Sequence, residues 1–106
     1  MSLRAALALA LLAAGPAAAE GTLLVIENRA TRAVDQIAIF PLARDGRVID
    51  DVLAASHDPL PPGQSRSLDT GLLACAPVQV WARLSDGEEV AARTDLCRNS
   101  RLIVQD

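Results

Sequence analysis

Hydrophobic and polar positions alternate with a period of two along much of the chain after residue 21. Residues 22–28 form an apolar run that ends in a polar turn cluster, and residues 35–40 (DQIAIF) carry isoleucine at every second position. A period of two is typical of a strand with one buried face. We therefore predict strands over both segments, and we expect them to be neighbouring antiparallel strands.

Two further strands are predicted from shorter runs. Residues 64–69 follow a proline-rich loop, and their polarity suits an edge strand with one solvated face, whereas residues 101–105 form a last apolar strand. The secondary structure of segment 48–54 is not determined by its pattern. It fits the second arm of a hairpin after the turn Asp45-Gly46, but its apolar spacing also fits a single helical turn.

The clearest local pattern is a β-hairpin with Ser85-Asp86-Gly87 as its loop, because glycine supplies the left-handed backbone that a three-residue loop needs. Pairing Leu84 with Glu88 fixes the register. The pairs expected on the inner face are then Ala82 with Val90, Val80 with Ala92, and Val78 with Thr94, and on the outer face Arg83 with Glu89.

The same register, continued to the open end of the hairpin, brings Cys75 opposite Cys97. We therefore predict one disulfide between these cysteines. Pro77 lies between the first cysteine and the strand and can introduce a bulge there, so the face that the bridge occupies stays open.

Residues 1–19 have the features of a secretory signal peptide. Arg4 precedes the uninterrupted apolar run Ala5–Ala14, and the small residues Ala17 and Ala19 precede Glu20 as signal peptidase requires. The apolar run is shorter than the ~20 residues of a membrane-spanning helix. We expect cleavage after Ala19 and a periplasmic or secreted protein. Disulfides are stable in these oxidising compartments.

The remaining residues 20–106 suffice for one domain. Six or seven short strands with frequent turn signals and no long helix indicate an all-β fold, a small antiparallel β-sandwich of the immunoglobulin-like kind with one disulfide. The chain is 51% hydrophobic but only 2% aromatic, so its core is shallow. Such a core gains much from a covalent link.

Charge and composition argue against several classes of partner and ligand. The net charge is −3, all basic residues are arginines, and no basic stripe with interleaved aromatics appears, which argues against nucleic acid and anionic membranes. No cofactor motif is present, and a single histidine with two paired cysteines argues against zinc or copper. Calcium is harder to dismiss, although EF-hand spacing is lacking and solvated charge is the favoured interpretation. The acidic residues concerned are Asp45, Asp50, Asp51 and Asp58.

A catalytic site is hard to build from the sequence. His57 is the only histidine; Asp58 is adjacent, and Ser65 is the nearest serine of a Gly-Gln-Ser-Arg-Ser run that lacks the second glycine of a nucleophile elbow. We therefore interpret His57 as a solvated loop residue.

Trp81 is the candidate contact residue. The hairpin register places it on the face assigned to solvent, near Arg83 and Arg93, and an exposed tryptophan among arginines is a common binding hot spot. The alternative, which we favour at this point, is that this face is covered and Trp81 is the main core residue. The inner and outer faces of the hairpin would then be exchanged.

The chain also resembles a group of small exported β-sandwich proteins of proteobacteria that have one disulfide and no assigned activity. The resemblance spans residues 20–106 and departs at Pro77 and Val78, where an aromatic residue is expected. It rests on Asn28, Ile37, Ile39, Leu60–Ser65, Cys75, Asp86-Gly87, Asp95–Cys97 and Leu102–Val104.

These observations favour a non-enzymatic binding or interaction module of the cell envelope, with another envelope protein as its partner. One alternative is a small hydrolase or inhibitor-like module that uses the loop of His57 and Ser65. A purely structural envelope protein is the other.

Overall fold

The computed structural model describes residues 2–5 and 22–106, and every regular element in these ranges is a β-strand. No helix of the described part is long and apolar enough to cross a membrane. The strands are β1 (Ser2–Ala5), β2 (Leu23–Asn28), β3 (Val34–Pro41), β4 (Ala54–Ser56), β5 (Ser65–Asp69), β6 (Pro77–Leu84), β7 (Glu89–Asp95) and β8 (Arg101–Gln105).

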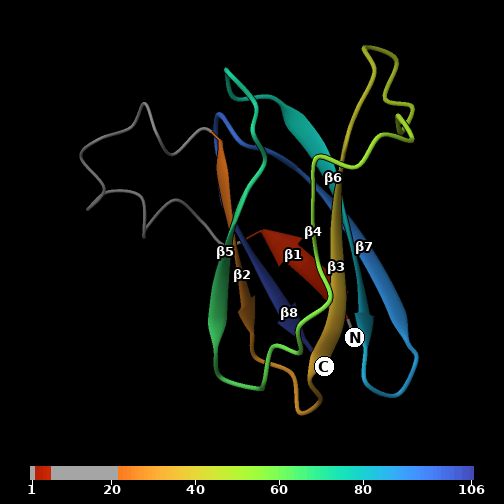
Figure 1. Cartoon of the computed structure of the whole chain (residues 1–106), viewed down its shortest axis with the longest axis vertical. Helices are drawn as coiled ribbons and strands as arrows, with labels where there is room; N and C mark the ends of the chain where they lie inside the picture. The colour runs from red at the N-terminus through yellow and green to blue at the C-terminus, as the bar shows by residue number, and fades with distance from the viewer. Residues whose placement is uncertain (1, 6–21) are drawn as a thin grey trace, which may run out of the picture.

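The strands form two four-stranded sheets, in the orders β1-β8-β2-β5 and β4-β3-β6-β7 (Figure 1). All neighbours pair antiparallel except β2 and β8, which run parallel. The two sheets face each other across a shared apolar core. The predicted all-β sandwich with one disulfide is therefore confirmed.

The expected pairing of the first two predicted strands is wrong, because β2 and β3 lie in different sheets. The chain crosses between the sheets in residues 29–33. The Asn28 side chain holds this crossing: its Nδ2 donates to the Arg32 carbonyl and its Oδ1 accepts from the Ala30 N–H, both at 2.9 Å. After this crossing β3 pairs with β4 and β6 of the other sheet and not with β2.

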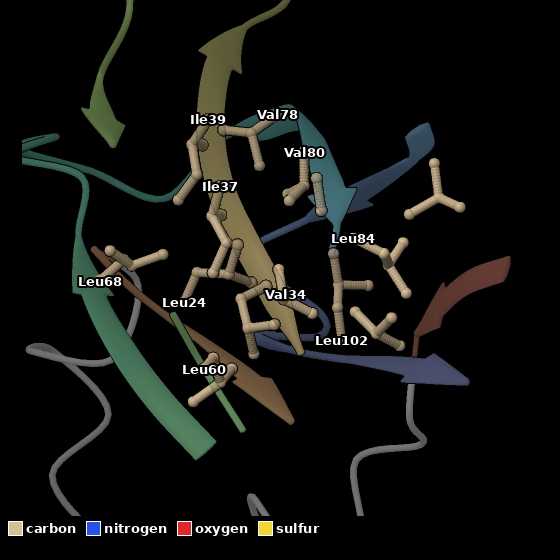
Figure 2. Close-up of a cluster of buried hydrophobic side chains, with 14 of the residues drawn as sticks. Leu24, Val34, Ile37, Ile39, Leu60, Leu68, Val78, Val80, Leu84 and Leu102 are labelled. Atoms are coloured by element: carbon tan, nitrogen blue, oxygen red, sulfur yellow. The ribbon is translucent and has the colours of Figure 1, made fainter. Parts of the chain in front are cut away.

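The core follows from the period of two in each strand (Figure 2). In β2 and β8 every second residue is buried, as Leu24, Ile26, Leu102 and Val104 show, and they pack against the inner face of the other sheet. The inner residues of that sheet are Val34, Ile37, Ile39, Val78, Val80, Ala82, Leu84 and Val90, with Leu60 and Leu68 closing one side.

Segment 48–54 is the irregular second arm of a hairpin with β3, and it is not a helical turn. Val48 makes one isolated bridge with Leu42, and the chain then continues without regular structure until β4 pairs antiparallel with β3. Two aspartates follow Ile49 directly, and aspartate is disfavoured in strands. The turn Asp45-Gly46 therefore closes a hairpin whose second arm is irregular until β4.

The hairpin of β6 and β7 has the predicted register. Ala82 pairs with Val90 and Arg83 with Glu89, and the Leu84 N–H donates to the Glu88 carbonyl at 2.8 Å. Gly87 has φ of 91°, the left-handed conformation that the loop was expected to require.

Replacing Gly87 by valine should therefore lower the free energy of unfolding by about 1 kcal/mol or more, because a β-branched residue is strained at this φ. Space is not the cause, since a Cβ at Gly87 would meet nothing within 4 Å. Urea unfolding measures the loss, and Ser85→Ala in the same exposed loop is the matched control. Equal stability of the two variants would contradict the strain argument.

The disulfide joins Cys75 to Cys97 as predicted, with their Cα atoms 5.0 Å apart. Pro77 pairs with Asp95 in the unbroken β6–β7 register, so no bulge separates the bridge from the hairpin. The half-buried Cys75 packs against the core, while Cys97 is exposed.

The expected signal peptide is described only in part. Its apolar run after Ala5 and its cleavage site at Ala19 lie outside the described residues. Ser2–Ala5 form β1, which pairs antiparallel with β8 and lies close to β7 of the other sheet (Figure 1).

Candidate functional site

The outer face of the sheet β4-β3-β6-β7 carries the candidate contact residues. Trp81 stands at the centre of a cross-strand row, with Ala38 of β3 on one side and Ala91 of β7 on the other. Ala55 of β4 continues the row beyond Ala38. Because directly opposed residues in a sheet point to the same face, the indole is flanked only by methyl groups along this row.

Trp81 is not a core residue, so the buried placement favoured from the sequence is wrong. The inner positions of β6 are fully buried and are occupied by Val78, Val80 and Ala82, whereas Trp81 is half-buried on the opposite face. Its indole Nε1 donates to Glu89 Oε1 at 3.0 Å. The small residues on both sides leave the ring without a large apolar neighbour along the row.

Two arginines lie beside Trp81 on this face. Arg93 is exposed, and its Nε donates to Gln79 Oε1 at 3.0 Å. Arg83 is half-buried, and no ion pair or side-chain hydrogen bond to another described residue occupies its guanidinium. The loop that follows β3 borders the face, because a Cβ at Gly46 would lie 3.3 Å from Arg93 Nη1.

We call Trp81, Gln79, Arg83 and Arg93 the Trp81 face. It combines one half-exposed aromatic ring with guanidinium and amide groups, which is the composition of protein-binding hot spots. Guanidinium groups bind carboxylates in a bidentate geometry, and a tryptophan supplies apolar contact area. The face is thus chemically suited to an extended or loop segment that offers acidic and apolar side chains.

His57 and Ser65 are both exposed: His57 directly follows β4, and Ser65 begins β5 of the other sheet. His57 Nδ1 is 2.8 Å from Gln36 Nε2 of β3, and among the described residues this is its side-chain partner. Ser56 is engaged elsewhere, since its Oγ accepts from Arg66 Nη1 at 2.9 Å. Arg66 also donates to the carbonyls of Asp58 and Pro59, so it anchors the loop of residues 57–63, the proline loop, to β5.

The acidic residues considered for calcium are distributed along exposed loops. Asp45 accepts the N–H of Arg47 at 3.0 Å and forms an ion pair with the same residue, as in an ordinary turn. In the part of the chain that the structure describes, no group of three histidine, cysteine or acidic residues is arranged to hold a metal ion.

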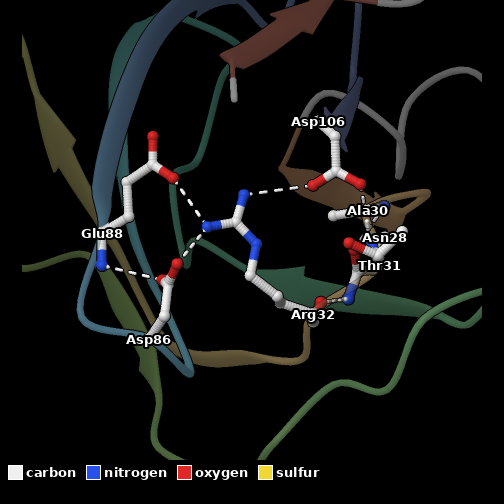
Figure 3. A network of polar contacts seen from close by, with 7 residues as sticks. All are labelled: Asn28, Ala30, Thr31, Arg32, Asp86, Glu88 and Asp106. Carbon is white, nitrogen blue, oxygen red and sulfur yellow. Dashed lines mark hydrogen bonds and ion pairs between the residues drawn. The ribbon is translucent and has the colours of Figure 1, made fainter.

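An ion-pair network that the sequence did not reveal lies at the loop of the β6–β7 hairpin (Figure 3). Arg32 donates to Asp86 and, at 2.8 Å, to Glu88 of the β6–β7 loop, and its other nitrogen reaches Asp106 at 3.1 Å. The Thr31 N–H donates to the second Asp106 oxygen at 2.9 Å. One guanidinium thus connects the crossing after β2, the hairpin loop and the residue after β8.

The network lowers the pKa of two carboxyl groups. For Asp86 the main cause is the hydrogen bond from the Glu88 backbone N–H, followed by the bond from Arg32. For Asp106 the main cause is the Thr31 side chain, with Arg32 adding to it. The three carboxylates raise the pKa of Arg32 in turn, with Glu88 the largest contributor.

A carboxyl group with a lowered folded-state pKa stabilises the protein above its ordinary pKa of ~4, and this contribution is lost as the pH falls through the folded-state value. We expect Arg32→Ala to be less stable than the parent at pH 7, with the difference shrinking below about pH 4. Thermal unfolding between pH 7 and pH 2 tests this. Arg44→Ala, which removes an exposed arginine from a loop, is the control, and a difference that does not depend on pH would contradict the role of the carboxylates.

Asn28 is a second residue whose role the sequence did not reveal. It is 0% exposed, and its Nδ2 also donates to the Leu60 carbonyl at 2.9 Å. Its own backbone bonds the proline loop through the Gln64 carbonyl and the Gly63 N–H. In the sequence, Asn28 stands at the end of a strand before a turn, which is typical of an ordinary turn residue. Nothing else in the sequence indicated that its side chain is buried.

Comparison of the chain with protein-family models, with curated proteins and with solved structures found no match in any of the three.

Proposed function

We propose that this protein is an exported, non-enzymatic interaction module of the cell envelope that binds another protein through the Trp81 face. The observation that carries the proposal is the placement of Trp81. A large aromatic ring lies half-exposed on a sheet face, between two alanines, while the inner face of the same strand is filled by valine and alanine. The core does not require a tryptophan at this position.

The arginines strengthen the proposal. Arg83 follows Trp81 by two residues in β6, so both side chains lie on the same face. The Arg83 guanidinium has no partner among the described residues. A partner carboxylate would find bidentate donors there without first displacing an internal ion pair. Arg93, the second arginine of this face, is exposed to solvent and donates through its Nε to Gln79.

Export is supported by the disulfide and by the signal-peptide pattern of residues 1–19. Disulfides persist in oxidising compartments and are rare in the cytosol of mesophiles. The protein therefore acts in the periplasm or after secretion. Mass spectrometry of the exported protein should give an amino terminus at Glu20 and the mass of a chain with one disulfide; a retained leader would contradict export.

Site-specific photocrosslinking tests the contact face. A photoreactive phenylalanine analogue at Arg83 should give a discrete crosslinked species with an envelope protein in exporting cells, because this position lies beside Trp81. The same analogue at Ser67, an exposed position on β5 of the other sheet, is the matched control. Mass spectrometry identifies the partner.

The substitution Trp81→Ala in the crosslinking variant should abolish the crosslinked species while leaving the disulfide and the melting transition in place. Equal crosslinking from Arg83 and Ser67, or a crosslink that persists without Trp81, would contradict the proposed face.

A further inference from the structure

The four sheet edges of the described domain are not equally protected. β4 has only three residues, and both β5 and β7 carry charged side chains, such as Arg66 in β5 and Arg93 in β7. Short length and charge are the usual means by which edge strands avoid unwanted pairing. The fourth edge is occupied by β1, which covers β8.

β8 itself is less protected, because its only charged residue is Arg101 at its first position. Its centre is Leu102-Ile103-Val104, without a charge or a proline. Its Ser100 and Val104 flanks bond to β2: the Val25 N–H donates to the Ser100 carbonyl at 2.8 Å, and the Arg29 N–H donates to the Val104 carbonyl at 2.7 Å. Because main-chain groups alternate in direction along a strand, those of Arg101, Ile103 and Gln105 face β1.

β1 shows that this edge accepts a strand. Ser2–Ala5 pairs with it antiparallel, and Arg4 lies opposite Ile103 at the centre of the register. The same four residues belong to the leader that export would remove. In the cell, β8 therefore becomes a free edge only if the protein is exported as proposed.

We propose that β8, once β1 is gone, pairs with β8 of a second copy of this chain. A two-fold axis requires the two edges to run antiparallel, which is the direction that the edge already accepts from β1. With the axis at Ile103, each Ile103 lies opposite its counterpart, and their outward-facing main-chain groups form the central hydrogen-bonded pair. The sheets of the two copies then join into one continuous sheet, β5-β2-β8-β8-β2-β5.

Side chains are compatible with this register. Leu102 lies opposite Val104 of the second copy, so the buried layer of each sandwich continues across the axis. Arg101 lies opposite Gln105 of the second copy, so no two arginines face each other. Each Arg101 also retains its own counter-charge, since its Nη2 is 3.3 Å from Glu27 Oε1 in the same chain. These features favour a second copy as the occupant over a segment of unrelated sequence.

The edge can be emptied within the full chain, which makes the test independent of export. In Arg4→Pro the central N–H of β1 is lost and β1 cannot pair in its register. The oxidised full chain should sediment as a monomer, and Arg4→Pro should sediment as a concentration-dependent dimer. Adding Ile103→Pro should restore the monomer. Adding Ala91→Pro should not, because Ala91 lies on the other outer edge, that of β7.

A second substitution covers the case in which proline damages β8. Ile103→Lys leaves every backbone donor in place but puts two like charges at the axis, so it should also convert the Arg4→Pro dimer to a monomer. An Arg4→Pro chain that stays monomeric at the highest soluble concentration would overturn the proposal, as would a dimer that survives both changes at Ile103.

If Arg4→Pro does not fold, the processed protein from exporting cells is measured instead. Its Ile103 amide should exchange slowly with solvent when concentrated and fast when dilute; fast exchange at both concentrations would overturn the proposal. A leader that stays attached in exporting cells would contradict export alone, since the full-chain variants still report on the β8 edge.

Discussion

Asn28→Ala should lower the free energy of unfolding by about 3 kcal/mol or more, most of the ~5 kcal/mol margin of a small domain. The substitution leaves the carbonyls of Arg32 and Leu60 and the N–H of Ala30 without their side-chain partner at a position that is 0% exposed. Each buried group without a partner costs roughly 1–3 kcal/mol. Urea unfolding followed by circular dichroism measures the loss.

Asn28→Asp separates the hydrogen bonds from the volume of the side chain. One carboxylate oxygen can still accept from the Ala30 N–H, but the other faces the carbonyl oxygens of Arg32 and Leu60, so the charged form is disfavoured and the pKa of the introduced group is raised. A raised folded-state pKa means that stability falls as the pH rises above ~4. The variant should thus be less stable at pH 7 than at pH 5. A variant whose deficit relative to the parent is the same at both pH values would show that Nδ2 does not face those carbonyls.

Loss of the disulfide is the second large effect. Cys75 and Cys97 are 22 residues apart in the sequence, and closing a loop of this length stabilises a protein by about 3 kcal/mol in the chain-entropy model. The double substitution Cys75→Ser/Cys97→Ser should lower the melting temperature by roughly 15 °C, since a domain of this size loses ~4–8 °C per kcal/mol.

The reductant provides the control for this experiment. Dithiothreitol should lower the melting temperature of the parent to that of the double variant and should leave the variant unchanged. An equal melting temperature for the oxidised parent and the double variant would mean that the bridge adds no stability.

Local patterns predicted the hairpin and the disulfide well because the interactions concerned are close in sequence. Leu84 and Glu88 are separated only by the loop, Gly87 supplies its left-handed backbone, and the period of two then determines every pair as far as the cysteines. Nothing outside this stretch was needed to place them.

Longer-range features could not be obtained in this way. Residues 22–28 and 35–40 carry equally good strand patterns, but no pattern tells whether two successive strands share a sheet or face each other across the core. Here the chain changes sheets in residues 29–33, where the Asn28 side chain bonds to residues 30, 32 and 60. A short polar side chain gives no sign in the sequence of being fully buried.

In the candidate site, too, the local features were predicted from the sequence and the long-range features were not. The hairpin register placed Arg83 and Arg93 with Trp81 on one face, but the preference for burying a lone tryptophan pointed the other way. Valines of β6, the leucines of β2 and β8 and the isoleucines of β3 already fill the core, and this is visible only once the sheets are packed. The Arg32 network is equally non-local, since it joins residues 32, 86, 88 and 106.

The parallel pairing of β2 with β8 has a consequence for the order of folding during synthesis. β2, the first strand of the described domain after residue 21, has β8 as one of its two neighbours, and that strand ends at Gln105. Its sheet therefore cannot close before β8 has been synthesised, and contacts between segments so far apart in the sequence form slowly. This sheet is thus still open while β3 to β7 are being made, and an open chain is what the proposed export through a narrow translocation channel requires.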